Sequence, residues 1–313
     1  MQSRRARTLA GAALLLGTFL VVTAVLAQVY AVPKLLKTPT DVDVKNILEG
    51  TLTTDGPEGL TTQEIRATNY TKADTERSDD EVVVMRDGTC VMKLEGDEVP
   101  ECEAYDEPDS RVLETDEVGY ATDRLTAAGV DDPEYVRDDI EARPAVLLGK
   151  WPFNSKKKDY QYYEDLLEAP VTAAYEGEED VDGLPTYRYQ VSFEEEPAEV
   201  TDGIQGLYTL VRTFWVEPAT GAVIDVETHG RRTLENGDLL AENKLSYTDE
   251  TVAQNVSDGK GNRLKIVLAQ TWVPIIGYGA GALLLLASAL LLLRRPDDEQ
   301  AALSYEREAA ATH

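Results

Sequence analysis

The sequence is poor in the residue types that catalytic and metal-binding sites use most often. It contains two histidines, His229 and His313, and two cysteines, Cys90 and Cys102. These residues do not form the cluster that a zinc site needs, and the chain has no CxxC, GxSxG or P-loop motif. Its acidic pairs are too numerous to single out a catalytic dyad. We therefore predict no enzymatic activity, no cofactor and no metal.

Positive charge is also scarce. The chain has 30 Lys and Arg against 58 Asp and Glu, which gives a net charge of -28. This balance argues against a nucleic-acid partner, because binding to phosphates needs a basic surface that displaces counterions. The acidity indicates a solvated surface that an anionic membrane would repel.

Two stretches, residues 9–32 and 272–293, lack charged residues altogether. Each is close to the ~20 residues that cross a hydrocarbon core, and a backbone in lipid must satisfy its own hydrogen bonds. Both stretches are therefore predicted to be transmembrane helices, and their lack of ionisable residues is typical of anchors rather than ion paths. Gly277 and Gly281 form a GxxxG motif, which allows close helix packing against the first span or against another protein.

Arginine residues set the expected orientation in the plasma membrane. Arg4, Arg5 and Arg7 precede the first span, and Arg294 and Arg295 follow the second. Because positive charge stays on the cytoplasmic side, both termini should be cytoplasmic. We expect a cytoplasmic N-terminus (1–7), transmembrane helix 1 (8–32), an extracytoplasmic domain (33–271), transmembrane helix 2 (272–293) and a cytoplasmic tail (294–313).

The first span has a second interpretation, as a cleaved signal peptide. Its apolar run is longer than the ~7–15 residues of a signal-peptide core and continues past the candidate cleavage site after Ala27, which favours an anchor. Under either interpretation the central domain is exported. The exported pair Cys90 and Cys102 is therefore predicted to form a disulfide.

The central region is predicted to be mainly β, a single large antiparallel domain between the two membrane helices. Three sites have the composition of hairpin turns: Asp87-Gly88, Asp182-Gly183 and the segment 217–221. A further strand around 239–247 extends the last hairpin. Residues 133–142 suggest a short helix, and 251–270 a helix interrupted at Gly259–Gly261. Segments 54–62, 74–80 and 95–110 resemble loops.

The stretch KWPFNSKKKDYQYYED (150–165) combines lysines with aromatic residues and allows two interpretations. In the first it is a rim that meets anionic lipid headgroups or a glycolipid. In the second the lysines protect a sheet edge, Trp151 and Phe153 fill the core, and Tyr160 and Tyr162 share one face. The rim of the first interpretation consists of Trp151, Phe153, Lys156, Lys157, Lys158, Tyr160 and Tyr162.

Several segments together resemble a two-pass actinobacterial envelope family of unknown function, often labelled PorA-like porin. The segments are YAVPKLLKTPTDVDV, KWPFNSKKKDYQYYE, YEGEEDVDGLPTYRYQ and RTFWVEPATGAVIDVE, in this order between the two spans. The resemblance implies a plasma-membrane protein that faces the cell envelope, in a family connected with mycolate-type glycolipids and polar growth. It supplies no catalytic residues. A membrane barrel would need lipid-facing apolar alternation, which these charged strands lack, so we do not expect this domain to form a pore.

These observations favour a non-enzymatic anchored protein whose β-domain binds or helps to traffic an envelope lipid or glycolipid, beside an envelope transporter. The alternative is a scaffold that organises envelope-synthesis proteins. An apolar cavity in the β-domain would favour the first hypothesis, and a filled core with an exposed patch would favour the second.

Overall fold

The computed structural model describes residues 2–57, 59–95, 111–137 and 139–293, and the backbone alone for residues 2–4. The chain divides into two compact units. The terminal unit contains the segments up to Leu35 and from Lys265, and the β-unit contains Leu36–Leu264.

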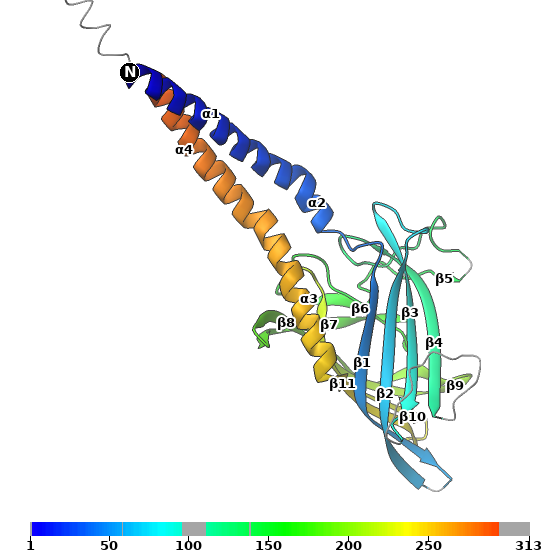
Figure 1. The fold of residues 1–313 in the computed structure, drawn as a ribbon. Helices are drawn as coiled ribbons and strands as arrows, with labels where there is room; N and C mark the ends of the chain where they lie inside the picture. The colour runs from blue at the N-terminus through cyan, green and yellow to red at the C-terminus, as the bar shows by residue number, and fades with distance from the viewer. Residues whose placement is uncertain (1, 58, 96–110, 138, 294–313) are drawn as a thin grey trace, which may run out of the picture. The chain divides into compact units, whose positions relative to one another are not determined.

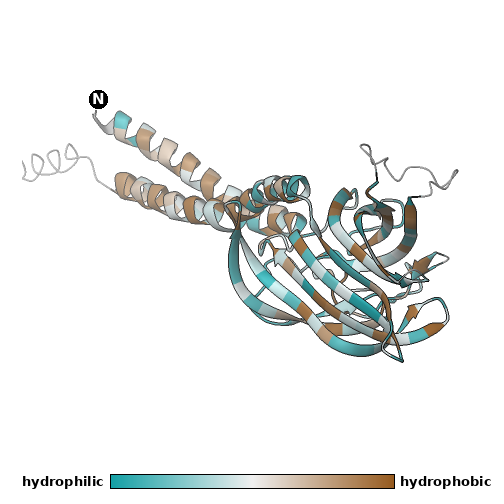
Figure 2. Ribbon diagram, turned by 90° about the horizontal axis from the view of Figure 1, so that it is seen from below, coloured by the Kyte–Doolittle hydropathy of each residue, from teal (hydrophilic) through white to brown (hydrophobic). Residues whose placement is uncertain are grey.

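The terminal unit consists of two long apolar helical segments (Figure 1). The helical stretches Arg5–Leu35 and Asp249–Leu293 are long and apolar enough to cross a membrane. Figure 2 shows that apolar residues dominate the first stretch and the C-terminal part of the second, while the N-terminal part of the second is largely hydrophilic. Its elements are α1 (Gln2–Leu26), a π-helical turn (Ala27–Ala31), α2 (Val32–Leu35), a second π-helical turn (Leu268–Trp272) and α4 (Val273–Leu293). The helix α3 (Asp249–Val267) belongs to the β-unit up to Leu264 and continues into the second π-helical turn.

The β-unit is built on an 11-stranded sheet in the order β5-β4-β3-β2-β1-β11-β10-β9-β8-β7-β6. The chain starts at the centre with β1, reaches one edge at β5, crosses to the other edge at β6 and returns to the centre with β11. All neighbouring pairs are antiparallel except β4 and β5. The prediction of a mainly β, antiparallel domain is confirmed. The strands are β1 (Asp43–Gly56), β2 (Gly59–Asp74), β3 (Val82–Lys93), β4 (Val112–Asp123), β5 (Ile140–Glu141), β6 (Tyr160–Glu164), β7 (Ala169–Val181), β8 (Leu184–Thr201), β9 (Ile204–Val216), β10 (Val223–Leu234) and β11 (Leu239–Tyr247).

Main-chain bridges between β4 and β6 link the two sides of the sheet. Gly129 pairs with Thr122 of β4. Leu147 pairs with Ala128, which follows β4, and with Tyr162 of β6. The Leu147 N–H donates to the Gln161 carbonyl at 3.0 Å, and the Tyr163 N–H donates to the Leu147 carbonyl at 3.0 Å. The main chain of Leu147 therefore covers part of the β6 edge, where an open edge would invite pairing with another chain.

Two of the predicted hairpins are confirmed. Asp182 and Gly183 join β7 to β8 with φ of 48° and 79°, as a type I′ turn requires. The segment after Val216 turns β9 into β10, with Gly221 at a φ of 72°. The strand predicted around 239–247 is β11.

The predicted hairpin at Asp87-Gly88 is wrong, because β3 runs straight through it. Asp87 pairs with Thr71 of β2 on one side and with Val118 of β4 on the other. Gly88 is not among the glycines with positive φ that such a turn would need. The Asp87 carboxylate accepts the Tyr120 hydroxyl at 2.6 Å, and burial raises its pKa. A composition typical of a turn has been overridden by pairing on both sides.

Two further predictions from local composition are wrong. Most of the predicted loop 54–62 belongs to the hairpin of β1 and β2, in which Thr53 and Thr62 share a hydrogen bond of 2.8 Å. The predicted helix 133–142 is a turn followed by β5. Ile140 is buried there against Val84 and Ala121, and this contact decides the local structure.

Gly259 and Gly261 do not interrupt the helix as predicted, since α3 is continuous from Asp249 to Val267. A Cβ atom on Gly259 would lie 2.8 Å from Leu184 Cδ2 and 3.1 Å from Ile224 Cδ1. The glycine therefore allows the helix to approach the sheet closely, rather than ending it.

Aromatic and aliphatic side chains fill the core between the sheet and the segment that connects β4 to β6. One cluster is centred on Trp151, Tyr189, Leu210 and Phe214, and a second on Val83, Met85, Tyr120 and Tyr163. The side chains of Trp151, Tyr189 and Leu210 are fully buried. Along the strands, polar and apolar residues alternate (Figure 2), as expected for a sheet with one buried face.

Candidate functional site

The loop before β6 carries the residues of the predicted rim, and Trp151 lies at the centre of its packing. Its ring is 5.0 Å from that of Tyr189, 4.9 Å from that of Phe214 and 5.7 Å from that of Tyr162, measured between centroids. Because Trp151 is 0% exposed, it cannot form part of a lipid-facing surface. The interpretation that placed Trp151 in the core is the correct one for this residue.

The other aromatic residues of the loop divide between core and surface. Tyr160 and Tyr162 share one face of β6 and pack against the same cluster as Trp151. Burial raises the pKa of the Tyr162 hydroxyl well above its ordinary value. Phe153 is only half-buried and lies against Lys150, whose Nζ is 3.9 Å from the ring centroid. Phe153, Tyr160 and Tyr162 are all partly buried, whereas Trp151 is fully buried.

Lys156, Lys157 and Lys158 are all exposed. Lys157 pairs with Glu178 at 2.6 Å, which raises the pKa of the lysine. Lys158 lies over the ring of Tyr160, 4.9 Å from its centroid. The lysines directly precede β6, and the prediction that they protect a sheet edge stays a prediction.

A buried carboxylate holds the turn between β9 and β10, to which this loop is attached. Glu217 is 0% exposed. Its Oε1 accepts the Ala219 N–H at 3.0 Å and Arg263 Nη1 at 2.8 Å, and its Oε2 accepts the Thr220 N–H and hydroxyl, both at 2.8 Å. The turn composition around Pro218 was visible in the sequence. Nothing local showed that its acid would be buried and paired with Arg263 of α3.

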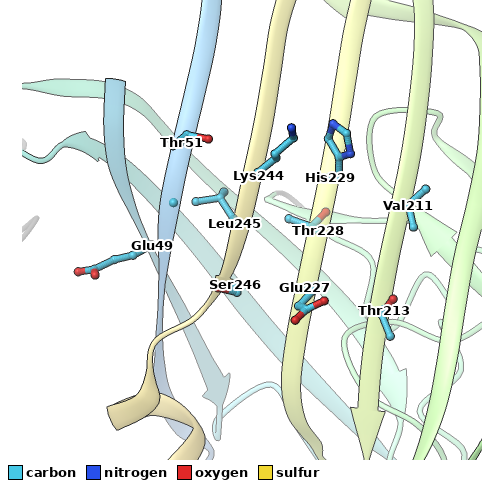
Figure 3. A pocket seen from close by; sticks show the side chains of 11 residues that line it. Glu49, Thr51, Val211, Thr213, Glu227, Thr228, His229, Lys244, Leu245 and Ser246 are labelled. Atoms are coloured by element: carbon cyan, nitrogen blue, oxygen red, sulfur yellow. The ribbon is translucent and has the colours of Figure 1, made fainter. Parts of the chain in front are cut away.

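A depression of about 430 Å³ lies on the outer face of β1, β11, β10 and β9, opposite the core. The strand register places its side chains in two rows that cross all four strands. Figure 3 shows the rows one above the other. The upper row is Thr51, Lys244, His229 and Val211, and the lower row is Glu49, Ser246, Glu227 and Thr213.

The two rows differ in charge. Lys244 and His229 belong to one row, while Glu49 and Glu227 belong to the next, about 7 Å away along the strands. His229 Nε2 lies 2.7 Å from Glu242 Oε1, and Lys244 Nζ lies 3.5 Å from the same oxygen. This contact with His229 is the main cause of the lowered pKa of Glu242. The depression therefore presents basic and acidic side chains in neighbouring rows, some of which are paired: Glu242 with His229 and Lys244, and Glu49 with Arg66.

Within the terminal unit, the GxxxG motif packs against α1. A Cβ atom on Gly277 would lie 2.5 Å from Ala24 Cβ, and one on Gly281 would lie 2.7 Å from Val21 Cγ2 and 3.0 Å from the Gly17 carbonyl oxygen. The Ser288 hydroxyl donates to the Ala10 carbonyl at 2.8 Å. The first of the two expected partners, the N-terminal span, is the one in contact with the motif.

We expect Gly281→Leu to destabilise the helix pair by about 1–3 kcal/mol, because the added side chain has no space against α1. Gly279→Leu is the matched control, since nothing lies within 4 Å of the Cβ position at Gly279. Unfolding of the full chain in mixed detergent micelles with increasing dodecyl sulfate would measure the difference. Equal midpoints for the two variants would contradict this packing.

Cys90 is 4% exposed on β3, and Cys102 lies outside the described residues. The Cys90–Cys102 disulfide therefore stays a prediction. We expect that alkylation of the unreduced protein under denaturing conditions, followed by peptide mass mapping, will find neither thiol modified. Recovery of both cysteines in alkylated form would show that the bond is absent.

A protein-family model described as porin PorA matches residues 9–290. The chain belongs to this family. The resemblance drawn from the sequence is confirmed, and PorA family membership together with the two apolar helices supports association with a membrane.

The other comparisons add little to the PorA family assignment. No curated protein matches the chain. One similar solved structure is the crystal structure of an N-terminal dehydratase from difficidin assembly line, at 8% identity over 69% of this chain and 82% of that chain. Its TM-score is 0.12, so no argument rests on it.

Proposed function

We propose that this PorA family member is a non-catalytic, membrane-anchored envelope protein that holds a partner protein against the outer face of its sheet. The observation that carries the proposal is the pair of charged rows across β1, β11, β10 and β9. Alternating charge on an exposed surface gives register and specificity to a protein contact. The filled core supports this function over storage of a lipid chain, since Trp151 and Leu210 occupy the centre of the larger cluster.

The partner would carry the complementary pattern, with acidic groups over Lys244 and His229 and basic groups over Glu227. A photo-crosslinking residue at Thr213 should give a defined adduct in intact cells. The double variant Lys244→Glu/Glu227→Lys keeps the net charge and reverses the pattern, so it should abolish that adduct. A crosslinker at Thr115, an exposed residue of β4, is the control. The same adducts from both positions, or an adduct unaffected by the charge exchange, would refute the proposal.

A second candidate partner is the polar headgroup of an envelope glycolipid. The hydroxyl groups of Thr51, Thr213 and Ser246 lie in the same depression as Lys244 and Glu227, and together they offer donors and acceptors for a polyhydroxylated ligand. Native mass spectrometry of the full chain released from mild detergent should then show a lipid adduct that is lost in Ser246→Ala/Thr213→Val. Absence of any adduct in the unmodified protein would exclude this candidate.

The proposal does not assign a pore to the sheet itself. The outer face of β10 carries Glu227, His229 and Arg231, and charges on a lipid-facing barrel surface are costly. Conductance of the purified full chain in a planar bilayer would test this point. Stable unitary currents that change in Lys244→Glu/Glu227→Lys would favour a pore over a scaffold.

The orientation is part of the same proposal, with both termini in the cytoplasm and the β-unit outside. The basis is the arginines at both ends of the apolar helices. We expect a membrane-impermeant maleimide to label Asp258→Cys, an exposed α3 position, in intact cells. Ser3→Cys should react only after lysis, and the unmodified chain controls for native thiols. Labelling of Ser3→Cys in intact cells would overturn this orientation.

A further inference from the structure

The loop at residues 150–155 is attached to two points of the β-unit, and the covalent chain keeps both points close to the apolar helices. The first attachment is at Thr38. Lys150 Nζ donates to Thr38 Oγ1 at 3.2 Å, Arg124 Nε donates to the Thr38 carbonyl at 2.7 Å, and the Phe153 N–H donates to the Leu125 carbonyl at 3.4 Å. Thr38 follows the last residue of α2, Leu35, by only three positions, so it lies within about 11 Å of that helix end.

The second attachment is at the turn between β9 and β10. The Trp151 N–H donates to the Gly221 carbonyl at 2.9 Å, and the Ser155 N–H donates to the Pro218 carbonyl at 2.8 Å. Glu217 of this turn holds Arg263 at 2.8 Å. Arg263 precedes Trp272, the start of the second uncharged run, by nine helical residues, which is about 14 Å. Both limits follow from chain length alone and hold for any angle between the two units.

The side chains at this place differ from those of an ordinary acidic, solvated surface. Leu125 is 48% exposed, and Phe153 is partly buried. Lys150 Nζ lies over the Phe153 ring, and burial lowers the pKa of this lysine to about 7. An exposed leucine and an aromatic ring next to a lysine are a combination suited to the boundary between headgroups and acyl chains.

We propose that Leu125 and Phe153 form a membrane-contact surface, which rests in the headgroup layer of the bilayer that holds the chain's own helices. Two short chain segments hold the surface near the membrane. Burial of the two apolar side chains in the headgroup layer would stabilise it there. The surface differs from the rim predicted from the sequence: Trp151 is in the core, Tyr160 and Tyr162 pack against it, and Leu125 is new. It is independent of the partner surface on β10 and β11.

Tryptophan reporters in the full chain, reconstituted in bilayer nanodiscs, provide the test. A Trp272→Phe background removes the tryptophan at the start of the second uncharged run. Leu125→Trp and Phe153→Trp each place a reporter on the proposed surface. Lipids brominated on the acyl chains near the headgroup quench tryptophans that reach this depth. Near-ultraviolet circular dichroism confirms folding of each variant, and the second reporter remains if one fails to fold.

Leu60→Trp and Ile204→Trp are the matched controls, since these residues are 68% and 45% exposed. Leu60 lies at the tip of the β1–β2 hairpin, roughly 40 Å along the strand from the start of β1. Ile204 lies at the tip of the β8–β9 hairpin, roughly 40 Å along β9 from the turn between β9 and β10. We expect bromolipid to quench the reporters at Leu125 and Phe153, and to leave both controls at the level of the background protein. Lys244→Glu/Glu227→Lys should not change the quenching. Reporters at Leu125 and Phe153 that are quenched no more than the one at Ile204 would overturn the proposal.

Discussion

Replacing Trp151 with alanine is expected to lower the free energy of unfolding of the β-unit by about 3–5 kcal/mol. The side chain is 0% exposed and packs against Tyr162, Tyr189 and Phe214, so its removal leaves a cavity that these rings cannot fill. Chemical denaturation of the full chain in detergent, followed by circular dichroism of the strands, would measure the loss.

Trp215→Ala is the matched control for this substitution. Trp215 is half-buried on β9 and donates Nε1–H to Glu179 at 2.9 Å, so its loss should cost only about 1 kcal/mol. Trp151→Phe refines the test, because Trp151 Nε1 is buried and has no hydrogen-bond partner in the described part of the chain. Phenylalanine removes that unsatisfied donor, and the cost should be well below that of alanine. Equal losses for Trp151→Ala and Trp215→Ala would contradict the central position of Trp151.

Replacing Glu217 with alanine is expected to cost about 3–5 kcal/mol of unfolding free energy. The substitution leaves the buried Thr220 N–H and hydroxyl without this acceptor and removes the carboxylate that pairs with Arg263. Because the turn also holds the loop at residues 150–155, the change should expose Trp151. A shift of the emission maximum toward longer wavelength would report this exposure below the main unfolding transition.

Asp180→Ala is the control for Glu217→Ala, since Asp180 accepts the Gly183 N–H at 2.6 Å in the exposed turn between β7 and β8. It should cost about 0.5 kcal/mol. Arg263→Met should lie between the two, because it removes the cation but leaves the donors of the turn on Glu217. A cost for Glu217→Ala no larger than for Asp180→Ala would show that the buried network contributes little.

Sequence patterns predicted the fold well where a local signal and a tertiary role agree. The turn at Asp182-Gly183 and the strand Leu239–Tyr247 are of this kind. The prediction failed at Asp87-Gly88, where pairing with β2 and β4 overrides a composition typical of a turn. Gly259 is a third case, in which a residue that weakens helices in isolation is needed for close packing on Leu184. Local propensity does not show which residues from distant parts of the chain will pair with or pack against a segment.

The candidate site was harder to predict than the fold. The composition of residues 150–165 suggested a lipid-facing rim, but Trp151 in this segment is buried in the core. The charged rows across β1, β11, β10 and β9 could not be predicted, because Thr51 and Lys244 become neighbours only through a pairing of the first and last strands. The burial of Glu217 likewise depends on α3, which is distant in sequence.

That central pairing also has a consequence for how the β-unit folds. Every other antiparallel pair in the sheet joins strands that follow one another in the chain, so each half can form step by step from hairpins. The pairing of β1 with β11, as in Leu48 with Tyr247, closes almost the whole unit. Loop-closure entropy delays contacts of such long sequence separation. Because synthesis proceeds from the N-terminus, strands β1 to β5 are made before β11 and have an unpaired edge on β1 until β11 is available. Before β1 and β11 pair, the exposed strand edge makes the chain more prone to aggregation than it is after the sheet is complete.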